Sequence, residues 1–177
     1  MSVSIRRATL FDLPGVAAVY EAIHDAEEAG FLTTGWLRGV YPVRATAEAA
    51  LQRGELYVLE ERNRILGAAI LNKRQVDVYA RAAWQYEAAE EQVGVLHTLV
   101  IAPRQSGKGY GRRFVDFYEN WARERDCTVL RLDTNARNER ARRMYAALGY
   151  REAAVVPTTF NGIPGVQLIL LEKHLPL

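Results

Sequence analysis

The chain has 177 residues, of which 49% are hydrophobic, and we expect a single domain, 1–177, with a substantial buried core. Lys and Arg total 23 against 21 Asp and Glu, a near balance that argues against a dedicated nucleic-acid-binding protein. One cysteine, Cys127, excludes an internal disulfide and a zinc site built from cysteines. The N-terminus lacks the apolar core of a signal peptide, and no apolar run reaches the roughly 20 residues that span a bilayer. We therefore expect a cytoplasmic protein that is not bound to a membrane.

The N-terminal half predicts a strand, two helices and a hairpin. Alternation of apolar and polar residues indicates strands, and apolar residues three or four apart indicate helices. Glycine and asparagine mark the turns. The expected elements are a strand ending near Ala8, a helix from an Asp12 N-cap to about Ile23, a loop over 30–42, a helix over 45–53, and a hairpin of 56–60 and 65–71.

The C-terminal half alternates strands and helices. Its longest apolar run, 93–101, lacks polar alternation, which is typical of a strand covered on both faces. The order predicts a mixed α/β sheet. The expected elements are an irregular segment or short helix over 76–92, a strand over 93–101, a helix from Tyr110, a strand over 128–132, a helix that Gly149 ends, and strands over 150–156 and 166–171.

The most informative motif is the run Ser106-Gly107-Lys108-Gly109-Tyr110-Gly111, between the 93–101 strand and the following helix. A glycine-rich turn from a strand to a helix N-terminus directs several backbone N–H groups into one concavity, which suits a phosphate or pyrophosphate. Alone, such a loop is more often an ordinary tight turn than a phosphate site. A second segment about thirty residues later, 138–150, strengthens the interpretation.

Together the two segments resemble the GCN5-related N-acetyltransferase (GNAT) family. The run Leu99-Val100-Ile101-Ala102-Pro103 followed by 107–111 is similar to the family's pyrophosphate motif, and 138–150 is similar to its second signature. Ser106 stands where the family usually has Arg or Gln, which affects only the side-chain share of a phosphate contact. The resemblance implies a single-domain GNAT-like fold: a mixed central sheet of about six to seven strands, about four helices, and splayed strands at the acyl-CoA site.

The resemblance also implies roles for particular residues. Tyr145 would be the general acid that protonates the departing thiolate, with an oxyanion donor from the backbone near Val100. His97 would be the base, since some family members carry a catalytic histidine at this point of the strand. No metal is implied. The residues expected to bind acetyl-CoA, as a co-substrate, are Leu99, Val100, Ile101, Ser106, Gly107, Lys108, Gly109, Tyr110, Gly111, Arg112, Asn138, Arg140 and Ala141.

Each residue also has a structural interpretation. Asn138 is a favoured helix N-cap, Tyr145 lies on an apolar stripe, and His97 could be a half-buried strand histidine. The arginines of 137–143 fit a solvated helix face better than a nucleic-acid site. We expect an acetyl-CoA-dependent N-acetyltransferase acting by direct attack of a primary amine, from a small metabolite or amino-acid-like acceptor. Alternatives are a protein N-terminal or lysine acetyltransferase and a non-catalytic CoA-binding module; the family resemblance also allows a homodimer.

Overall fold

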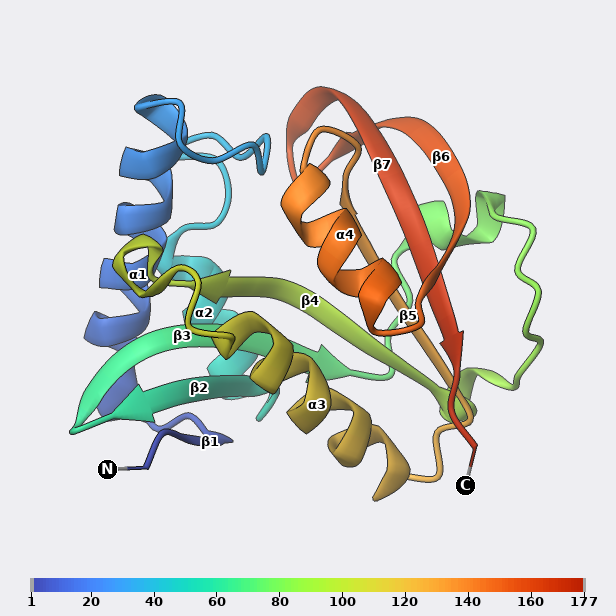
Figure 1. Ribbon diagram of the computed structural model, residues 1–177, viewed down its shortest axis with the longest axis horizontal. Coiled ribbons are helices and arrows are strands. Elements are labelled where there is room, and N and C mark those ends of the chain that lie inside the picture. Colours follow the sequence, from blue (N-terminus) through green and yellow to red (C-terminus); the bar gives the residue numbers. More distant parts are fainter. Residues whose placement is uncertain (1, 177) are drawn as a thin grey trace.

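The structure, a computed structural model, describes residues 2–176 and places seven strands in one mixed sheet (Figure 1). The strand order is β1-β2-β3-β4-β5-β7-β6. Only the β4–β5 pair is parallel, and all other neighbours are antiparallel. The strands are β1 (Ser4–Arg7), β2 (Leu56–Glu61), β3 (Arg64–Asn72), β4 (Val93–Ile101), β5 (Val129–Asn135), β6 (Arg151–Phe160) and β7 (Ile163–His174).

Four α-helices cover the two faces of this sheet. α1 (Leu13–Glu28) and α2 (Arg44–Gln52) pack on one face, with Val16 and Ala47 fully buried there. α3 (Tyr110–Arg123) and α4 (Glu139–Ala147) pack on the other (Figure 1). The predicted element order, the mixed sheet and the helix count are confirmed. None of the helices described within 2–176 is both long and apolar enough to cross a bilayer.

β4 and β5 separate halfway along their length, as the family resemblance implied (Figure 1). They pair only from Val93–Leu96 to Val129–Leu132. Beyond this point β4 stays paired with β3 alone and β5 with β7, so residues 97–101 have a free edge. A bulge adds to the divergence: Thr98 has a φ of 50°, and such a bulge bends its strand and redirects side chains.

Several local predictions needed correction. Asp12 does not cap α1 with its side chain, because a short 3₁₀ turn precedes that helix and Asp12 is already helical. Its carboxylate instead accepts hydrogen bonds from the N–H of Thr9 (2.7 Å) and from Arg6 (2.8 Å). The last two strands are longer than predicted and turn at Asn161 and Gly162, both with positive φ.

Two long loops are held against the sheet by buried or clustered charges. The Glu27 carboxylate on α1 accepts the N–H groups of Thr34 (2.8 Å) and Gly35 (2.9 Å), which holds the loop between α1 and α2. On β7, Glu172 is fully buried and accepts the N–H of Gln85 at 2.8 Å. Each loop is thus held by a carboxylate, one on α1 and one on β7.

Candidate active site

A groove of about 730 Å³ follows the free edge of β4 and the glycine-rich loop to the start of α4. Phe31 and Trp36 from the α1–α2 loop line its other side. Of the residues predicted to bind acetyl-CoA, only Lys108 does not line the groove; its Nζ donates to Oε1 of Gln105 (2.7 Å). The predicted residues that line it are Leu99, Val100, Ile101, Ser106, Gly107, Gly109, Tyr110, Gly111, Arg112, Asn138, Arg140 and Ala141.

The glycine-rich loop presents backbone donors to this groove. Gly107 and Gly109 have φ of 82° and 76°, values that side-chain-bearing residues rarely adopt. The first helical bond of α3 is donated by Arg113 N to the Gly109 carbonyl (3.0 Å). The N–H groups before it therefore have no helical partner, and the helix dipole adds partial positive charge at this point. The corner suits a pyrophosphate.

α4 begins beside this loop and is joined to it by side chains. Asn138 caps the helix, its Oδ1 accepting the N–H of Ala141 at 3.2 Å. Arg140 donates from Nη1 to Oγ of Ser106, so the residue that departs from the family pattern is fixed by the second motif. α3 and α4 lie close together, because a Cβ at Gly111 would be 3.2 Å from Sδ of Met144.

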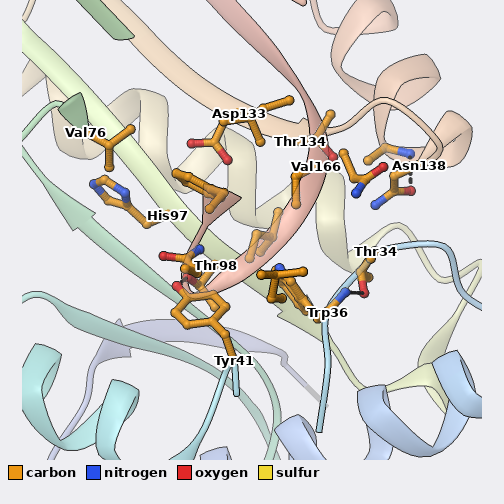
Figure 2. A pocket seen from close by; sticks show the side chains of 18 of the residues that line it. Thr34, Trp36, Tyr41, Val76, His97, Thr98, Asp133, Thr134, Asn138 and Val166 are labelled. Carbon is orange, nitrogen blue, oxygen red and sulfur yellow. Dashed lines mark hydrogen bonds between the residues drawn. The ribbon is translucent and has the colours of Figure 1, made fainter. Parts of the chain in front are cut away.

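A second, smaller cavity of about 130 Å³ opens between the diverging strands. Figure 2 shows Thr34, Trp36 and Tyr41 of the α1–α2 loop on one side and Asp133, Thr134 and Val166 on the other. We call it the inner pocket. The groove and the inner pocket share lining residues from three parts of the chain, the α1–α2 loop, β4 and α4: Thr34, Trp36, Leu99, Asn138, Ala141 and Tyr145.

Tyr145 lies where the two cavities meet. Its ring is 5% exposed and packs edge-on against Tyr150, with centroids 5.6 Å apart. The hydroxyl has no hydrogen-bond partner among residues 2–176 of the structure. Burial, helped by the nearby Asp133 carboxylate, raises the pKa of Tyr145 above its usual value. The phenol is therefore protonated at neutral pH, the form that a general acid requires.

His97 lines the inner pocket but not the groove. Its Nε2 lies 2.8 Å from Oδ1 of Asn72. That amide is oriented by Glu55, which accepts from Nδ2 (3.2 Å), and by the N–H of Arg74, which donates to Oδ1 (2.9 Å). Nε2 must then donate, and Nδ1 keeps the free lone pair. Burial lowers the pKa of His97 to about 4, so the ring is neutral near pH 7.

Asp133 is a residue of the pocket that the sequence analysis did not identify. It lies on β5 just beyond the last residue paired with β4. Its Oδ2 accepts a 2.6 Å hydrogen bond from the hydroxyl of Tyr79. Burial raises the pKa of Asp133 to about 6, partly offset by this hydrogen bond. Its only signal in the sequence was an acidic residue at the end of an apolar strand.

With this geometry established, comparison with known proteins decides the family. The sequence profile of the Acetyltransferase (GNAT) family matches residues 16–150. The chain belongs to the GNAT family. This confirms the predicted family and the predicted enzyme class, an acyl-CoA-dependent N-acetyltransferase. The match runs from within α1 to just beyond α4 and includes the glycine-rich loop and Tyr145.

Individual relatives are more distant. An aminoglycoside N(6')-acetyltransferase type 1 from Serratia marcescens is 28% identical over 78 residues, which are 42% of this chain and 53% of that protein. The chain thus matches about half the length of this curated relative. An N-acetyltransferase from Staphylococcus aureus Mu50 has a TM-score of 0.73 at 19% identity, covering 99% of this chain and 100% of that one.

One structural neighbour was solved with a ligand. The yncA protein of Salmonella typhimurium, with its cofactor acetyl-CoA, has a TM-score of 0.70 at 17% identity and covers 100% of this chain and 96% of its own. A ribosomal-protein-alanine N-acetyltransferase from Brucella melitensis has a TM-score of 0.72 at 21% identity, covering 97% of this chain and 99% of that one. At these identities the likeness shows the fold alone. In residues 2–176, His, Cys, Asp and Glu form no cluster of three that could hold a metal ion.

Proposed function

We propose that the GNAT protein transfers the acetyl group of acetyl-CoA to a primary amine of a small metabolite or amino-acid-like acceptor held in the inner pocket. The supporting observation is the meeting of the two cavities at Leu99 and Tyr145. A donor in the long groove and an acceptor in the inner pocket would meet at the one phenol that both cavities share. Such confinement of two reactants replaces a bimolecular encounter by an intramolecular one.

The donor is assigned to the groove by chemistry. The free N–H groups at the start of α3 suit the pyrophosphate of acetyl-CoA, with Gly107 and Gly109 allowing close approach of the backbone. The free edge of β4 over 97–101 suits the amide groups of pantetheine, by addition of a strand-like partner. A donor bound by these two elements would have its thioester end beside Tyr145.

The reaction follows from these positions. The neutral amine attacks the thioester carbonyl, and the oxyanion is stabilised by a backbone N–H near Val100 on the free edge. The C–S bond then breaks, and the Tyr145 hydroxyl gives its proton to the thiolate. The attacking amine must first lose a proton, and His97 is the base that the family resemblance assigned. Its Nδ1 is available for that role, although burial makes His97 a weak base at neutral pH.

The test combines binding and turnover. Titration calorimetry should detect acetyl-CoA binding, and thiol release should report turnover across amines, amino acids and short peptides. Tyr145→Phe keeps the ring and its packing, so kcat should fall by about 100-fold or more while the Kd of acetyl-CoA stays within about twofold. Equal losses in kcat and affinity would count against the acid role.

The same experiment separates the alternatives. Binding without turnover over the whole panel indicates a non-catalytic CoA-binding module, and turnover confined to peptides indicates a protein acetyltransferase. A cytoplasmic location and a homodimer are further proposals from the sequence. Analytical ultracentrifugation at micromolar concentration tests the dimer.

A further inference from the structure

The inner pocket has one carboxylate among its lining residues, that of Asp133. Oδ2 is occupied by the Tyr79 hydroxyl at 2.6 Å, and Oδ1 has no hydrogen-bond partner among residues 2–176. Asp133 faces the pocket because β4 leaves β5 after Leu96, so the next β5 residues have no β4 neighbour. A half-buried carboxylate with a free oxygen, lining a small pocket, is incompletely solvated and favours a cationic hydrogen-bond donor.

The rest of the lining carries no compensating cation. No lysine or arginine lines the inner pocket, and His97 is neutral with its Nε2–H bound to Asn72. A carboxylate on the acceptor would therefore lie unpaired in a pocket that already holds one negative charge. An acceptor with several ammonium groups would find one partner and leave the others desolvated. Both situations leave a charge incompletely solvated and without a partner, so the pocket discriminates by charge.

The remaining walls suit an uncharged body of limited size. Trp36 and Tyr41 stand edge to face with ring centroids 6.0 Å apart, and Phe160 adds a third aromatic ring. The α1–α2 loop and the tip of the β6–β7 hairpin meet over the pocket: a Cβ at Gly162 would lie 3.4 Å from Cγ1 of Val40. This closure and the volume of about 130 Å³ favour a compact molecule over an extended peptide.

From these observations we infer that the acceptor is a compact monoamine whose other groups carry no charge, and that Asp133 binds its ammonium group and then takes one of its protons. The inference rests on the proposed function, and it deepens that proposal by naming the charge class of the substrate and by assigning the role of base to Asp133 in place of His97. The ammonium N–H bond breaks, the proton passes to the free carboxylate oxygen, and the neutral nitrogen attacks the thioester carbon. As the C–S bond breaks, Tyr145 protonates the thiolate, and the second proton of the nitrogen passes to the Tyr145 phenolate, which leaves the amide. Asp133 later releases this proton to water, so each turnover yields one amide, one thiol and one proton.

The substrate half is tested with matched acceptors. Alaninamide and phenylalaninamide differ from alanine and phenylalanine by a carboxamide in place of a carboxylate, and spermidine adds further ammonium groups. We expect kcat/KM, read by thiol release, to be at least about tenfold higher for the better amide than for its amino acid or for spermidine. Equal or reversed values, or turnover confined to peptide N-termini, would overturn the inference.

The residue half is tested with Asp133→Asn, which keeps the shape and an oxygen for Tyr79. This variant should lower kcat/KM for the amide at least about tenfold and shrink the amide-to-carboxylate preference, with the Kd of acetyl-CoA unchanged. Asp77→Asn, on the exposed loop outside the pocket, is the charge-matched control and should behave like the unmodified protein. An unchanged preference in Asp133→Asn would refute the assignment.

Failure of the proposed function can be told apart from failure of this inference. If no amine is acetylated, calorimetry on the CoA-bound protein measures acceptor binding directly. The same preference for the amide, lost in Asp133→Asn, would uphold the recognition role while removing catalysis. Equal binding of amide and amino acid would refute the recognition role as well.

Discussion

Asp133 and His97, the two candidate bases of the inner pocket, would give catalysis different pH dependences. Among the titratable side chains around Asp133, Tyr79 and Tyr145 have pKa values raised above their usual 10, and the pKa of Tyr41 is raised to about 12. Only Asp133, with a pKa of about 6, and His97, with a pKa of about 4, change charge between pH 4 and 7. A base works only when unprotonated, so kcat/KM must fall as pH drops through its pKa.

The size of the fall identifies the base. A group with a pKa of 6 is about 90% unprotonated at pH 7 and about 9% at pH 5, which is a tenfold loss. A group with a pKa of 4 is still about 90% unprotonated at pH 5, a loss of only about 1.1-fold. If Asp133 is the base, we therefore expect kcat/KM to drop about tenfold between pH 7 and pH 5. The α-ammonium group of an amino-acid amide has a pKa of about 8, so it is about 90% charged at pH 7 and fully charged at pH 5, and it adds almost no change of its own.

The assay is thiol release at low acceptor concentration, in buffers of constant ionic strength, with circular dichroism to show that the protein stays folded at pH 5. His97→Gln should retain the midpoint near pH 6, and Asp133→Asn should lose it. A wild-type profile that stays flat down to pH 5 would refute the reasoning and return the base role to His97. Persistence of the midpoint in Asp133→Asn would refute it equally.

Three further predictions concern binding and stability. Gly109→Ala should raise the Kd of acetyl-CoA at least about fivefold, whereas Gly165→Ala, also at positive φ with open space around it, should cost similar stability (about 1–2 kcal/mol) without affecting binding. Burial raises the pKa of Asp133 from 3.8 to about 6, so the ionised carboxylate destabilises the folded state. This destabilisation is absent below pH 3.8, grows as the pH rises, and is complete above about pH 6. Asp133→Asn should therefore raise the unfolding free energy at pH 7.5 by up to about 3 kcal/mol in urea denaturation. The pKa of Asp12 is lowered to about 2, mainly by Arg6, so Asp12→Asn should cost about 1–2 kcal/mol at pH 7, a difference that shrinks as pH falls from 4 towards 2.

The groove was predictable from the sequence because its parts are local. The glycine-rich loop, the Asn138 cap and the position of Tyr145 on α4 depend on residues close together in the chain. Periodicity and turn chemistry report such relations directly. The same holds for the turn between β2 and β3, where Asn63, the residue expected to tolerate the turn, has a positive φ, as does Arg62 beside it. Predictions of this kind needed no knowledge of distant contacts.

The inner pocket depends on contacts between distant segments, and the sequence did not specify it. Asp133 becomes distinctive only because β4 diverges and because Tyr79, 54 residues earlier, donates to it. The α1–α2 loop that closes the pocket carries Trp36 and Tyr41, and its placement follows from the Glu27 carboxylate on α1, which accepts the N–H groups of Thr34 and Gly35. Asp12 is another residue whose contacts the sequence did not specify. Its carboxylate accepts hydrogen bonds from Thr9 and Arg6 and does not cap the helix that it was expected to cap.

The availability of Asp133 depends on how its nearest cation is used. Arg131 lies two residues earlier on β5, so both side chains leave the same face of the sheet. The Arg131 guanidinium donates to Gln75 and to the Tyr86 carbonyl (3.0 Å), and it stacks 4.3 Å above Trp84. These partners hold the cation against the 73–92 loop, and Asp133 keeps only the neutral Tyr79 hydroxyl. A salt bridge here would lower the pKa of Asp133 and fill its free oxygen. The arrangement therefore keeps a carboxylate unpaired at some cost in stability, as expected of a group that must exchange a cation and a proton in each cycle.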